Sequence, residues 1–288
     1  MEKLTDIRYV KAVLEKHGFT FSKALGQNFL VNPGVCPKMA AMCGATAEDG
    51  VLEIGPGAGV LTRELAHTAK KVVAVELDKR LLPVLEETLA EENNVTVVQG
   101  DAMKLDLHEL IRREFPEGRV FVCANLPYYI TSPMIMRLLE DRLPVQSLTV
   151  MVQKEAAQRL CAPPGTRACG AISAAVQFYS QPEMLFSVSA GSFLPPPKVD
   201  SEVIRLTLRD KPPVEVTEEA VLFRVVRASF CQRRKTLSNS LSAGLSVPKA
   251  QVSSWIERAG LPPSVRAEQL SLRDFAVLAE LFRTESQP

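Results

Sequence analysis

The fold class of this chain is decided by residues 51–66, which read Val51-Leu52-Glu53-Ile54-Gly55-Pro56-Gly57-Ala58-Gly59-Val60-Leu61-Thr62-Arg63-Glu64-Leu65-Ala66. The first four residues predict a buried strand, a glycine-rich loop follows, and residues 60–66 have the spacing of a helix. Glycines let the backbone pass close to a ligand because no Cβ stands in the way. The order strand, glycine loop, helix is typical of an α/β protein with a ligand at the end of its first strand.

The next predicted strand, residues 72–76, ends in Glu76, which lies 21 positions after Gly55. A carboxylate at this place accepts hydrogen bonds from ribose hydroxyls. The loop reads G-x-G-x-G, whereas dinucleotide sites use G-x-G-x-x-G, and it lacks the Lys-Ser/Thr pair of a phosphate-binding loop. A ligand with a nucleoside and no phosphate fits better, and we expect S-adenosylmethionine.

Two further predicted strands also end in polar residues. Residues 95–99 lead to Asp101, and residues 120–124 lead to Asn125-Leu126-Pro127-Tyr128. Parallel strands bring their carboxyl ends to one edge of a sheet, so we expect both groups to face the same ligand crevice. An amide oxygen, carbonyls stiffened by proline and a flat ring suit a planar base with an exocyclic amine. Asp101 also fits a helix N-cap, and the four-residue stretch also fits an ordinary turn.

Three more strands are predicted at residues 147–152, 184–188 and 202–208. The last two are joined by a segment whose three prolines impose a stiff, extended backbone, Ser192-Phe193-Leu194-Pro195-Pro196-Pro197-Lys198-Val199-Asp200. This segment fits a rigid connection, and it also fits a loop that presents Phe193 at the ligand edge.

The composition changes at Asp210-Lys211-Pro212-Pro213, which predicts a domain boundary between residues 1–209 and residues 210–288. The second part shows several helical patterns and no clear strand. It carries a local basic cluster, defined as Arg224, Arg227, Arg233, Arg234 and Lys235. Such a cluster fits either a solvated face or a contact with RNA phosphates, and we expect the phosphate contact.

Composition excludes several other kinds of site. The chain has 288 residues, of which 46% are hydrophobic and 23% charged, and a net charge of +1. Its six cysteines form no C-x-x-C pair, and its three histidines are far apart, so we expect neither a metal site nor histidine catalysis. The first twenty residues alternate charged and apolar side chains, unlike a signal peptide, and no apolar run is long enough for a membrane. A cytoplasmic protein without a membrane partner is expected.

Several segments together resemble the ribosomal RNA adenine N6-dimethyltransferase family, in particular its bacterial small-subunit (16S) type. In chain order they are Leu25-Gly26-Gln27-Asn28-Phe29-Leu30, Glu53-Ile54-Gly55-Pro56-Gly57-Ala58-Gly59, Glu76-Leu77-Asp78, Gly100-Asp101-Ala102, Asn125-Leu126-Pro127-Tyr128, Gln153-Lys154-Glu155, residues 193–201 and residues 230–237. They extend over nearly the whole chain. The triple-proline segment and Gln232-Arg233-Arg234-Lys235-Thr236-Leu237 favour the small-subunit type over relatives that modify large-subunit RNA.

The resemblance implies a seven-stranded, Rossmann-like class I methyltransferase sheet with a small all-helical C-terminal domain that recognises RNA. It implies cofactor contacts at Gln27, Asn28, Leu30, Gly55, Gly57, Glu76, Leu77, Asp101, Ala102 and Asn125. The target adenine is expected to meet Asn125, Leu126, Pro127, Tyr128 and Phe193.

The expected reaction is methyl transfer from S-adenosylmethionine to the N6 amines of two adjacent adenines in the 3′-terminal hairpin of 16S rRNA. The expected product is N6,N6-dimethyladenosine. The expected partner is the immature 30S subunit, and we therefore expect the protein to take part in maturation of the small subunit. Three alternatives stay open: a large-subunit rRNA methyltransferase, a DNA adenine-N6 methyltransferase, and a non-catalytic ribosome-assembly factor of the same fold.

Overall fold

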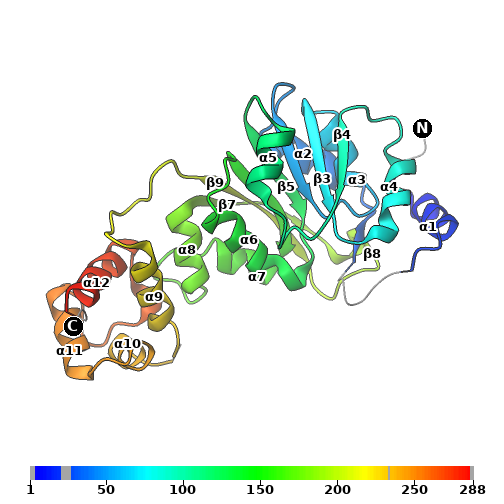
Figure 1. Ribbon diagram of the computed structural model, residues 1–288. Helices are drawn as coiled ribbons and strands as arrows, with labels where there is room; N and C mark the ends of the chain where they lie inside the picture. Colours follow the sequence, from blue (N-terminus) through cyan, green and yellow to red (C-terminus); the bar gives the residue numbers. More distant parts are fainter. Residues whose placement is uncertain (1–3, 21–26, 233, 286–288) are drawn as a thin grey trace. The chain divides into compact units, whose positions relative to one another are not determined.

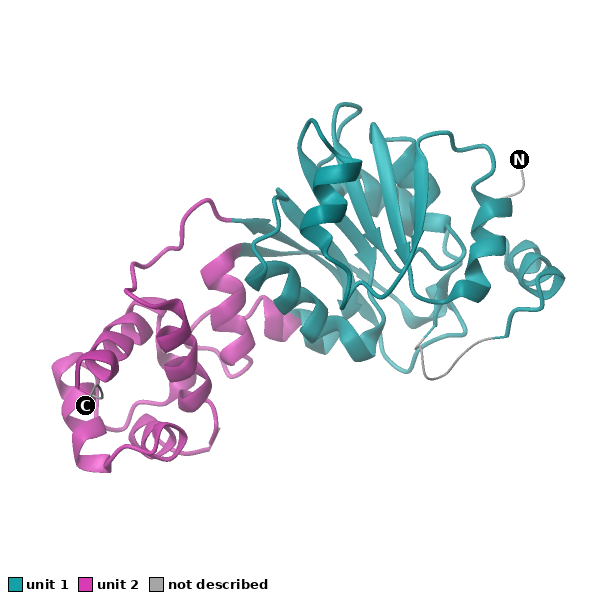
Figure 2. Ribbon diagram, in the orientation of Figure 1, with its two compact units in different colours: residues 1–157, 181–208 teal, residues 158–180, 209–288 magenta. Residues whose placement is uncertain are grey.

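The computed structural model describes residues 4–20, 27–232 and 234–285 and divides the chain into two compact units (Figures 1 and 2). Unit 1 comprises Met1–Ala157 and Gln181–Leu208, and unit 2 comprises Gln158–Ser180 and Arg209–Pro288. Unit 2 therefore includes Gln158–Ser180, a segment that the predicted boundary at residue 209 assigned to the first domain.

Seven strands among the described residues form one sheet, in the order β4-β3-β2-β5-β6-β9-β7. Their bounds are β2 (Gly50–Ile54), β3 (Lys71–Glu76), β4 (Val95–Gln99), β5 (Val120–Asn125), β6 (Ser147–Gln153), β7 (Ser180–Val188) and β9 (Ser201–Leu208). Strands β4, β3, β2, β5 and β6 run parallel to one another, and β9 is antiparallel to β6. The predicted seven-stranded sheet is confirmed, and its five parallel strands bring their carboxyl ends to one edge.

The central strands are almost continuously buried, as expected for parallel strands covered on both faces. Helices α2 and α3 pack on the sheet through one apolar cluster that includes Met39, Leu65, Val51, Val72 and Cys123. The helices of unit 1 are α1 (Ile7–Lys16), α2 (Val35–Cys43), α3 (Val60–Ala66), α4 (Leu82–Thr88), α5 (Leu107–Glu114) and α6 (Thr131–Glu140), with short 3-10 turns η1 (Lys79–Leu81), η2 (Tyr128–Ile130) and η3 (Ala190–Ser192). Helix α7 (Lys154–Leu160) crosses from unit 1 into unit 2.

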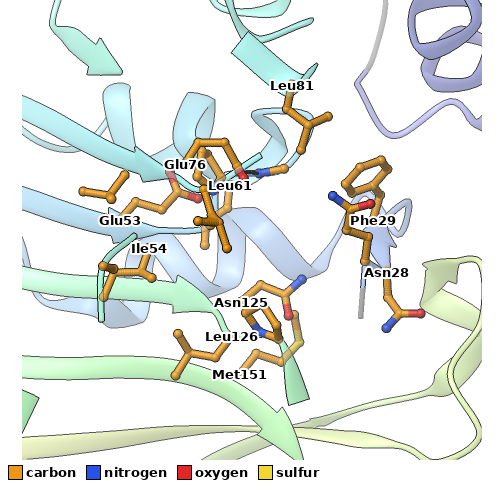
Figure 3. A pocket seen from close by; sticks show the side chains of 18 of the residues that line it. Asn28, Phe29, Glu53, Ile54, Leu61, Glu76, Leu81, Asn125, Leu126 and Met151 are labelled. Carbon is orange, nitrogen blue, oxygen red and sulfur yellow. Dashed lines mark hydrogen bonds between the residues drawn. The ribbon is translucent and has the colours of Figure 1, made fainter. Parts of the chain in front are cut away.

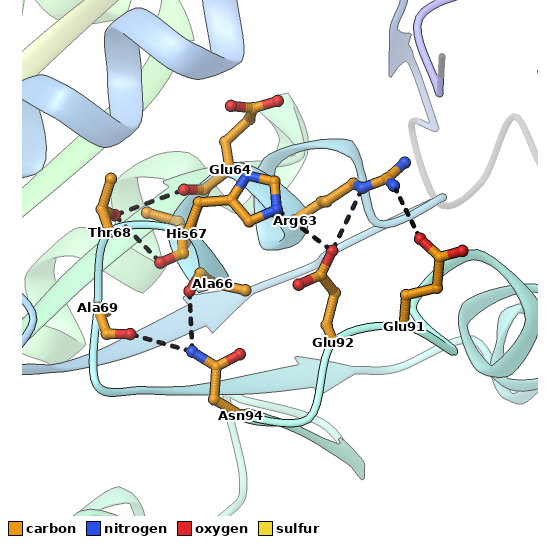
Figure 4. A network of polar contacts seen from close by, with 10 residues as sticks. Arg63, Glu64, Ala66, His67, Thr68, Ala69, Glu91, Glu92 and Asn94 are labelled. Carbon is orange, nitrogen blue, oxygen red and sulfur yellow. Dashed lines mark hydrogen bonds and ion pairs between the residues drawn. The ribbon is translucent and has the colours of Figure 1, made fainter. Parts of the chain in front are cut away.

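A polar network fixes the end of α3, the helix that follows the glycine loop (Figure 4). The side-chain nitrogen of Asn94 donates to the carbonyls of Ala66 and Ala69, at 2.8 and 3.0 Å. The guanidinium of Arg63 pairs with Glu92 at 3.3 Å. These contacts satisfy carbonyls that a helix end leaves open, and they join α3 to the segment before β4.

A second, two-stranded sheet lies outside the main one. Strand β1 (Phe29–Leu30) pairs antiparallel with β8 (Phe193–Leu194), and Val31 donates its backbone N–H to the carbonyl of Ser192 at 2.9 Å. This pairing ties the N-terminal segment to the proline-rich segment. Leu25 and Gly26, the first two residues of the N-terminal motif, lie outside the described residues.

The elements that lie wholly within unit 2 are helical in its described residues, as predicted for the C-terminal part. They are α8 (Ala171–Tyr179), α9 (Glu219–Ser229), α10 (Leu237–Leu245), α11 (Lys249–Arg258), α12 (Leu272–Glu285) and the turn η4 (Ala267–Gln269). The ring of Phe178 meets Phe223 edge to face at a centroid distance of 5.2 Å, which joins α8 to α9. A Cβ on Gly244 would lie 2.7 Å from the Cα of Ala228, so glycine permits the close crossing of α10 and α9. None of the helices within the described residues is both long and apolar enough to cross a bilayer.

Candidate active site

A cavity of about 1120 Å³, including the part open to solvent, lies in unit 1 where β2, β3, β4 and β5 end (Figure 3). It brings together most of the residues that the sequence assigns to a cofactor and a base. From those assignments its lining contains Gln27, Asn28, Leu30, Gly55, Gly57, Glu76, Leu77, Asp101, Ala102, Asn125, Leu126, Pro127 and Tyr128. Segments far apart in the chain thus share one concave surface, as ligand sites of open α/β sheets do.

The glycine loop forms one wall of the cavity. Gly57 has a φ of 61°, in the left-handed region that favours glycine. A Cβ at this position would stand 3.1 Å from the ring of Phe29, so a side chain would crowd the loop against β1. The loop therefore exposes bare backbone to the cavity.

Glu76 ends β3 and is 5% exposed. Its Oε1 accepts the backbone N–H of Asp78 at 2.7 Å, and its Oε2 accepts that of Gly57 at 3.3 Å. Burial raises the pKa of Glu76, while these backbone hydrogen bonds oppose the shift. The carboxylate is thus held in a fixed orientation and keeps lone pairs for a ligand hydroxyl.

Asp78 fixes the position of Gln27. The Gln27 side-chain nitrogen donates to Asp78 Oδ2 at 2.9 Å. Hydrogen bonds from Arg80 lower the pKa of Asp78 to about 2, so this carboxylate stays charged at neutral pH. The charged acceptor holds Gln27 at the rim of the cavity and leaves Asn28 beside it in the lining.

Asn125 is the last residue of β5, and its side-chain amide has no hydrogen-bond partner in the part of the chain that the structure describes. The two residues that follow are held by the backbone. Leu126 donates its N–H to the carbonyl of Met151 at 3.2 Å, and the carbonyl of Pro127 accepts from Ile130 N and Thr131 Oγ1 at 3.1 and 3.2 Å. The Leu126 carbonyl, by contrast, has no partner among the described residues. The side-chain amide of Asn125 and the backbone carbonyl of Leu126, which are neighbours in the chain, therefore remain available to a ligand.

Asp101 follows β4 and accepts the backbone N–H of Met103 at 2.9 Å. The loop behind it is held by Arg137 on α6, whose guanidinium donates to the carbonyls of Ala102 and Leu105 at 2.8 and 2.7 Å. Arg137 also pairs with Asp141 at 3.1 Å. One side chain thus links the loop of Asp101 to the helix that follows Tyr128.

The structure does not bring Phe193 to this cavity. The ring is 3% exposed and belongs to the same buried cluster as Leu30. In the β1–β8 pair Phe193 lies opposite Leu30, and its ring packs into the core. The expectation that the proline-rich segment presents Phe193 at the ligand edge is not met in this structure.

The basic cluster belongs to unit 2, and none of its described residues is part of the cavity lining. Arg224, Arg227, Arg234 and Lys235 are exposed, and Arg233 lies outside the described residues. The Arg224 guanidinium stands 5.0 Å from the centroid of Phe282, so its position is partly fixed by the aromatic ring. Contact of this cluster with RNA stays a prediction.

The lining also contains residues that were not predicted as site residues, and Glu53 and Tyr129 are two of them. Glu53 is 1% exposed, and its Oε2 has no hydrogen-bond partner among the described residues. Burial, with the nearby charge of Glu76, raises the pKa of Glu53 to about 8. Its signal in the sequence is an acid inside a buried strand. Tyr129 is 52% exposed, and its only signal in the sequence is its place directly after Tyr128.

Within the described residues, no three His, Cys, Asp or Glu side chains gather as metal ligands would.

Known proteins resemble this chain over nearly its whole length. The family model described as ribosomal RNA adenine dimethylase matches residues 18–283. Proteins named ribosomal RNA small subunit methyltransferase A from Bacillus mycoides (strain KBAB4) and Bacillus cereus (strain B4264) are each 48% identical over 283 residues, which is 97% of either chain.

Two solved structures share the fold. A dimethyladenosine transferase from Plasmodium falciparum superposes with a TM-score of 0.72 at 28% identity, over 90% of this chain and 98% of that one. The 23S rRNA methyltransferase ErmE superposes with a TM-score of 0.66 at 26% identity, over 89% and 100%.

Proposed function

The chain belongs to the ribosomal RNA adenine dimethylase family, and we propose that it methylates the N6 amines of two adjacent adenines in the 3′-terminal hairpin of 16S rRNA. The methyl donor is S-adenosylmethionine, the product is N6,N6-dimethyladenosine, and the partner is the immature 30S subunit in the cytoplasm. The observation that carries the proposal is the unpartnered amide of Asn125 in the same cavity as Glu76 and the glycine loop. The 48% identity to small-subunit enzymes supports the choice of RNA.

The residues of the cavity fit S-adenosylmethionine. The bare backbone of the glycine loop would face the methionine part, and Glu76 has lone pairs for ribose hydroxyls. Leu77, which is 44% exposed, would contact the adenine ring, and Asp101 would accept a hydrogen bond from the exocyclic amine of that ring. The bound cofactor supplies an electrophilic methyl group on a positively charged sulfur.

Asn125 and Leu126 orient the target amine. The amine lone pair is delocalised into the adenine ring, so the amine is a weak nucleophile. The Oδ1 atom of Asn125 and the carbonyl of Leu126 accept its two hydrogens, which directs the lone pair at the methyl group. Pro127 fixes the turn between them and Tyr128, with a φ of −56°. Methyl transfer leaves a positive charge on the nitrogen, and this methylated ammonium is a strong acid that releases its proton to water, so the reaction needs no dedicated base.

Tyr128 stacks on the target adenine after the base has left its helix. Burial raises the pKa of Tyr128, so its ring stays neutral and does not act as a phenolate. Unstacking a base costs a few kcal/mol, and one aromatic stack returns roughly 1–3 kcal/mol. A single ring therefore offsets much of this cost, and contacts elsewhere on the RNA supply the rest.

A labelling experiment tests the proposal against its competitors. The chain is incubated with S-adenosylmethionine labelled in the methyl group and with unmethylated small subunits, large-subunit RNA or duplex DNA. We expect label only in small-subunit RNA, recovered as dimethyladenosine. Label in large-subunit RNA would favour a function like that of ErmE, whose fold this chain shares. Label in no substrate, with intact binding to subunits, would favour a non-catalytic assembly factor.

A further inference from the structure

Ser201 and Tyr128 share a hydrogen bond that connects two motifs 73 residues apart. The Ser201 hydroxyl lies 2.8 Å from the Tyr128 hydroxyl, and Ser201 is 0% exposed. Neither hydroxyl has another hydrogen-bond partner within the described residues. Ser201 begins β9 directly after the proline-rich segment and ends the motif of residues 193–201, which has no part in the proposed methyl transfer itself.

Backbone contacts on both sides fix the place of Ser201. It lies opposite Gln153 in the antiparallel β6–β9 pair. The carbonyl of its neighbour Asp200 accepts from Lys154 N at 3.0 Å, and the Asp200 carboxylate accepts from Ala190 N at 2.9 Å. The serine hydroxyl is therefore carried by the rigid sheet and not by a free loop.

Tyr128 is held from its other end by the turn η2. The carbonyl of Pro127 accepts from Ile130 N and from Thr131 Oγ1, which fixes the backbone around Tyr128. A tyrosine hydroxyl lies on the long axis of its ring. A bond to this hydroxyl therefore fixes the direction in which the side chain leaves the backbone, the χ1 angle.

We propose that Ser201 is a positioning residue that keeps the Tyr128 ring in the direction required to stack on the target adenine. This inference rests on the proposed function. Without the bond, the half-buried ring can turn to another rotamer, and the adenine amine loses its alignment with Asn125. The high pKa of Tyr128 agrees with this role, because both hydroxyls stay neutral and one donates to the other.

A double-mutant cycle between Ser201→Ala and Tyr128→Phe tests the inference on unmethylated small subunits. Each change removes one hydroxyl and keeps the rest of the side chain. We expect each single variant to lower kcat three- to tenfold, the range of one net hydrogen bond, and the double variant to show no greater decrease. The KM for RNA stays near that of the wild type, because many other contacts hold the RNA. The dissociation constant of S-adenosylmethionine, measured by calorimetry, stays unchanged.

Ser147→Ala is the matched control. Ser147 is another buried serine of the β6–β9 pair, opposite Thr207, and its hydroxyl has no hydrogen-bond partner among the described residues. We expect wild-type kcat in this variant. Decreases that add up in the double variant, or wild-type kcat in Ser201→Ala, would overturn the inference. If Ser201→Ala is too unstable to assay, wild-type kcat in Tyr128→Phe overturns it. Failure of the wild-type chain to methylate any substrate would instead overturn the proposed function.

Discussion

Asn125 and Glu76 line the same cavity, and the proposed function gives them different tasks that substitutions can separate. Asn125→Ala removes an acceptor for the target amine, and we expect kcat to fall by roughly 100-fold or more. The cofactor affinity, measured by calorimetry, should stay within about twofold because Glu76 and the glycine loop are untouched. Glu76→Ala should instead weaken cofactor binding by roughly tenfold or more, because a charged hydrogen-bond acceptor is removed. Wild-type turnover in Asn125→Ala would exclude its assigned role.

Glu53 makes the stability of unit 1 depend on pH. Its pKa of about 8 in the folded chain lies above the ordinary value of 4.5, so between these values the folded state holds a proton that the unfolded chain has released. Stability is therefore highest below this window and falls as the pH rises through it. Glu53→Gln cannot titrate and should remove this decrease.

The prediction is measured by urea unfolding without cofactor at about pH 6 and about pH 8.5. From about pH 6 to about pH 8.5 the free energy of unfolding of the wild type should fall by at least about 1 kcal/mol more than that of Glu53→Gln. This difference is equivalent to less than one pKa unit. Glu109→Gln is the control, because its side chain is 55% exposed on α5. An equal pH dependence in wild type and Glu53→Gln would mean that Glu53 is ionised in the folded chain.

At the scale of elements, Arg137 holds the loop after β4 against α6. Arg137→Met removes two hydrogen bonds to backbone carbonyls and keeps most of the apolar side chain. We expect the loop of Asp101 to loosen and the dissociation constant of the cofactor to rise three- to tenfold. Arg112→Met is the matched control, because Arg112 is 72% exposed and pairs only with Glu109 among the described residues. Equal affinities in the two variants would show that Arg137 does not support the cofactor loop.

The elements that the sequence predicted correctly are those with a strong local pattern. The strand from Val95 to Gln99 and the helix from Val60 to Ala66 have the predicted bounds, because apolar periodicity and glycine mark their limits. The same local signals placed Glu76, Asp101 and Asn125 at strand ends, and all three line the cavity.

What the sequence could not predict depends on contacts between distant segments. Strands β1 and β8 have two residues each, too few for a periodic pattern, and they exist because they pair with each other. Phe193, which was expected at the ligand edge, lies in this pair and is buried. No local sequence pattern could predict the Ser201–Tyr128 hydrogen bond either, because the two residues lie far apart in the chain.

At the scale of the whole molecule, the cavity and the basic cluster belong to different compact units. If unit 2 binds RNA, neutral glutamine at Arg227, Arg234 and Lys235 together should weaken RNA binding and leave the cofactor affinity unchanged. The plot of log affinity against log salt should become shallower by about 0.7–0.9 for each phosphate that the variant no longer neutralises. Titrations at several salt concentrations measure this slope.

The control neutralises three exposed cations of unit 1, Lys11, Lys70 and Arg112, which changes the net charge by the same amount. A slope that changes equally in both triple variants would mean that RNA responds to net charge alone. In that case the basic cluster would be an ordinary solvated face.

The pairing of β1 with β8 also sets an order of events during synthesis. Phe29 leaves the ribosome early, but its strand partner Leu194 is made only after β2 to β6 are complete. A growing chain can therefore assemble the glycine loop and the parallel half of the sheet before Phe29 and Leu30 gain their strand partner. The backbone pairing that supports Phe29 and Leu30 in the cavity wall therefore forms only once about two thirds of the polypeptide has been translated.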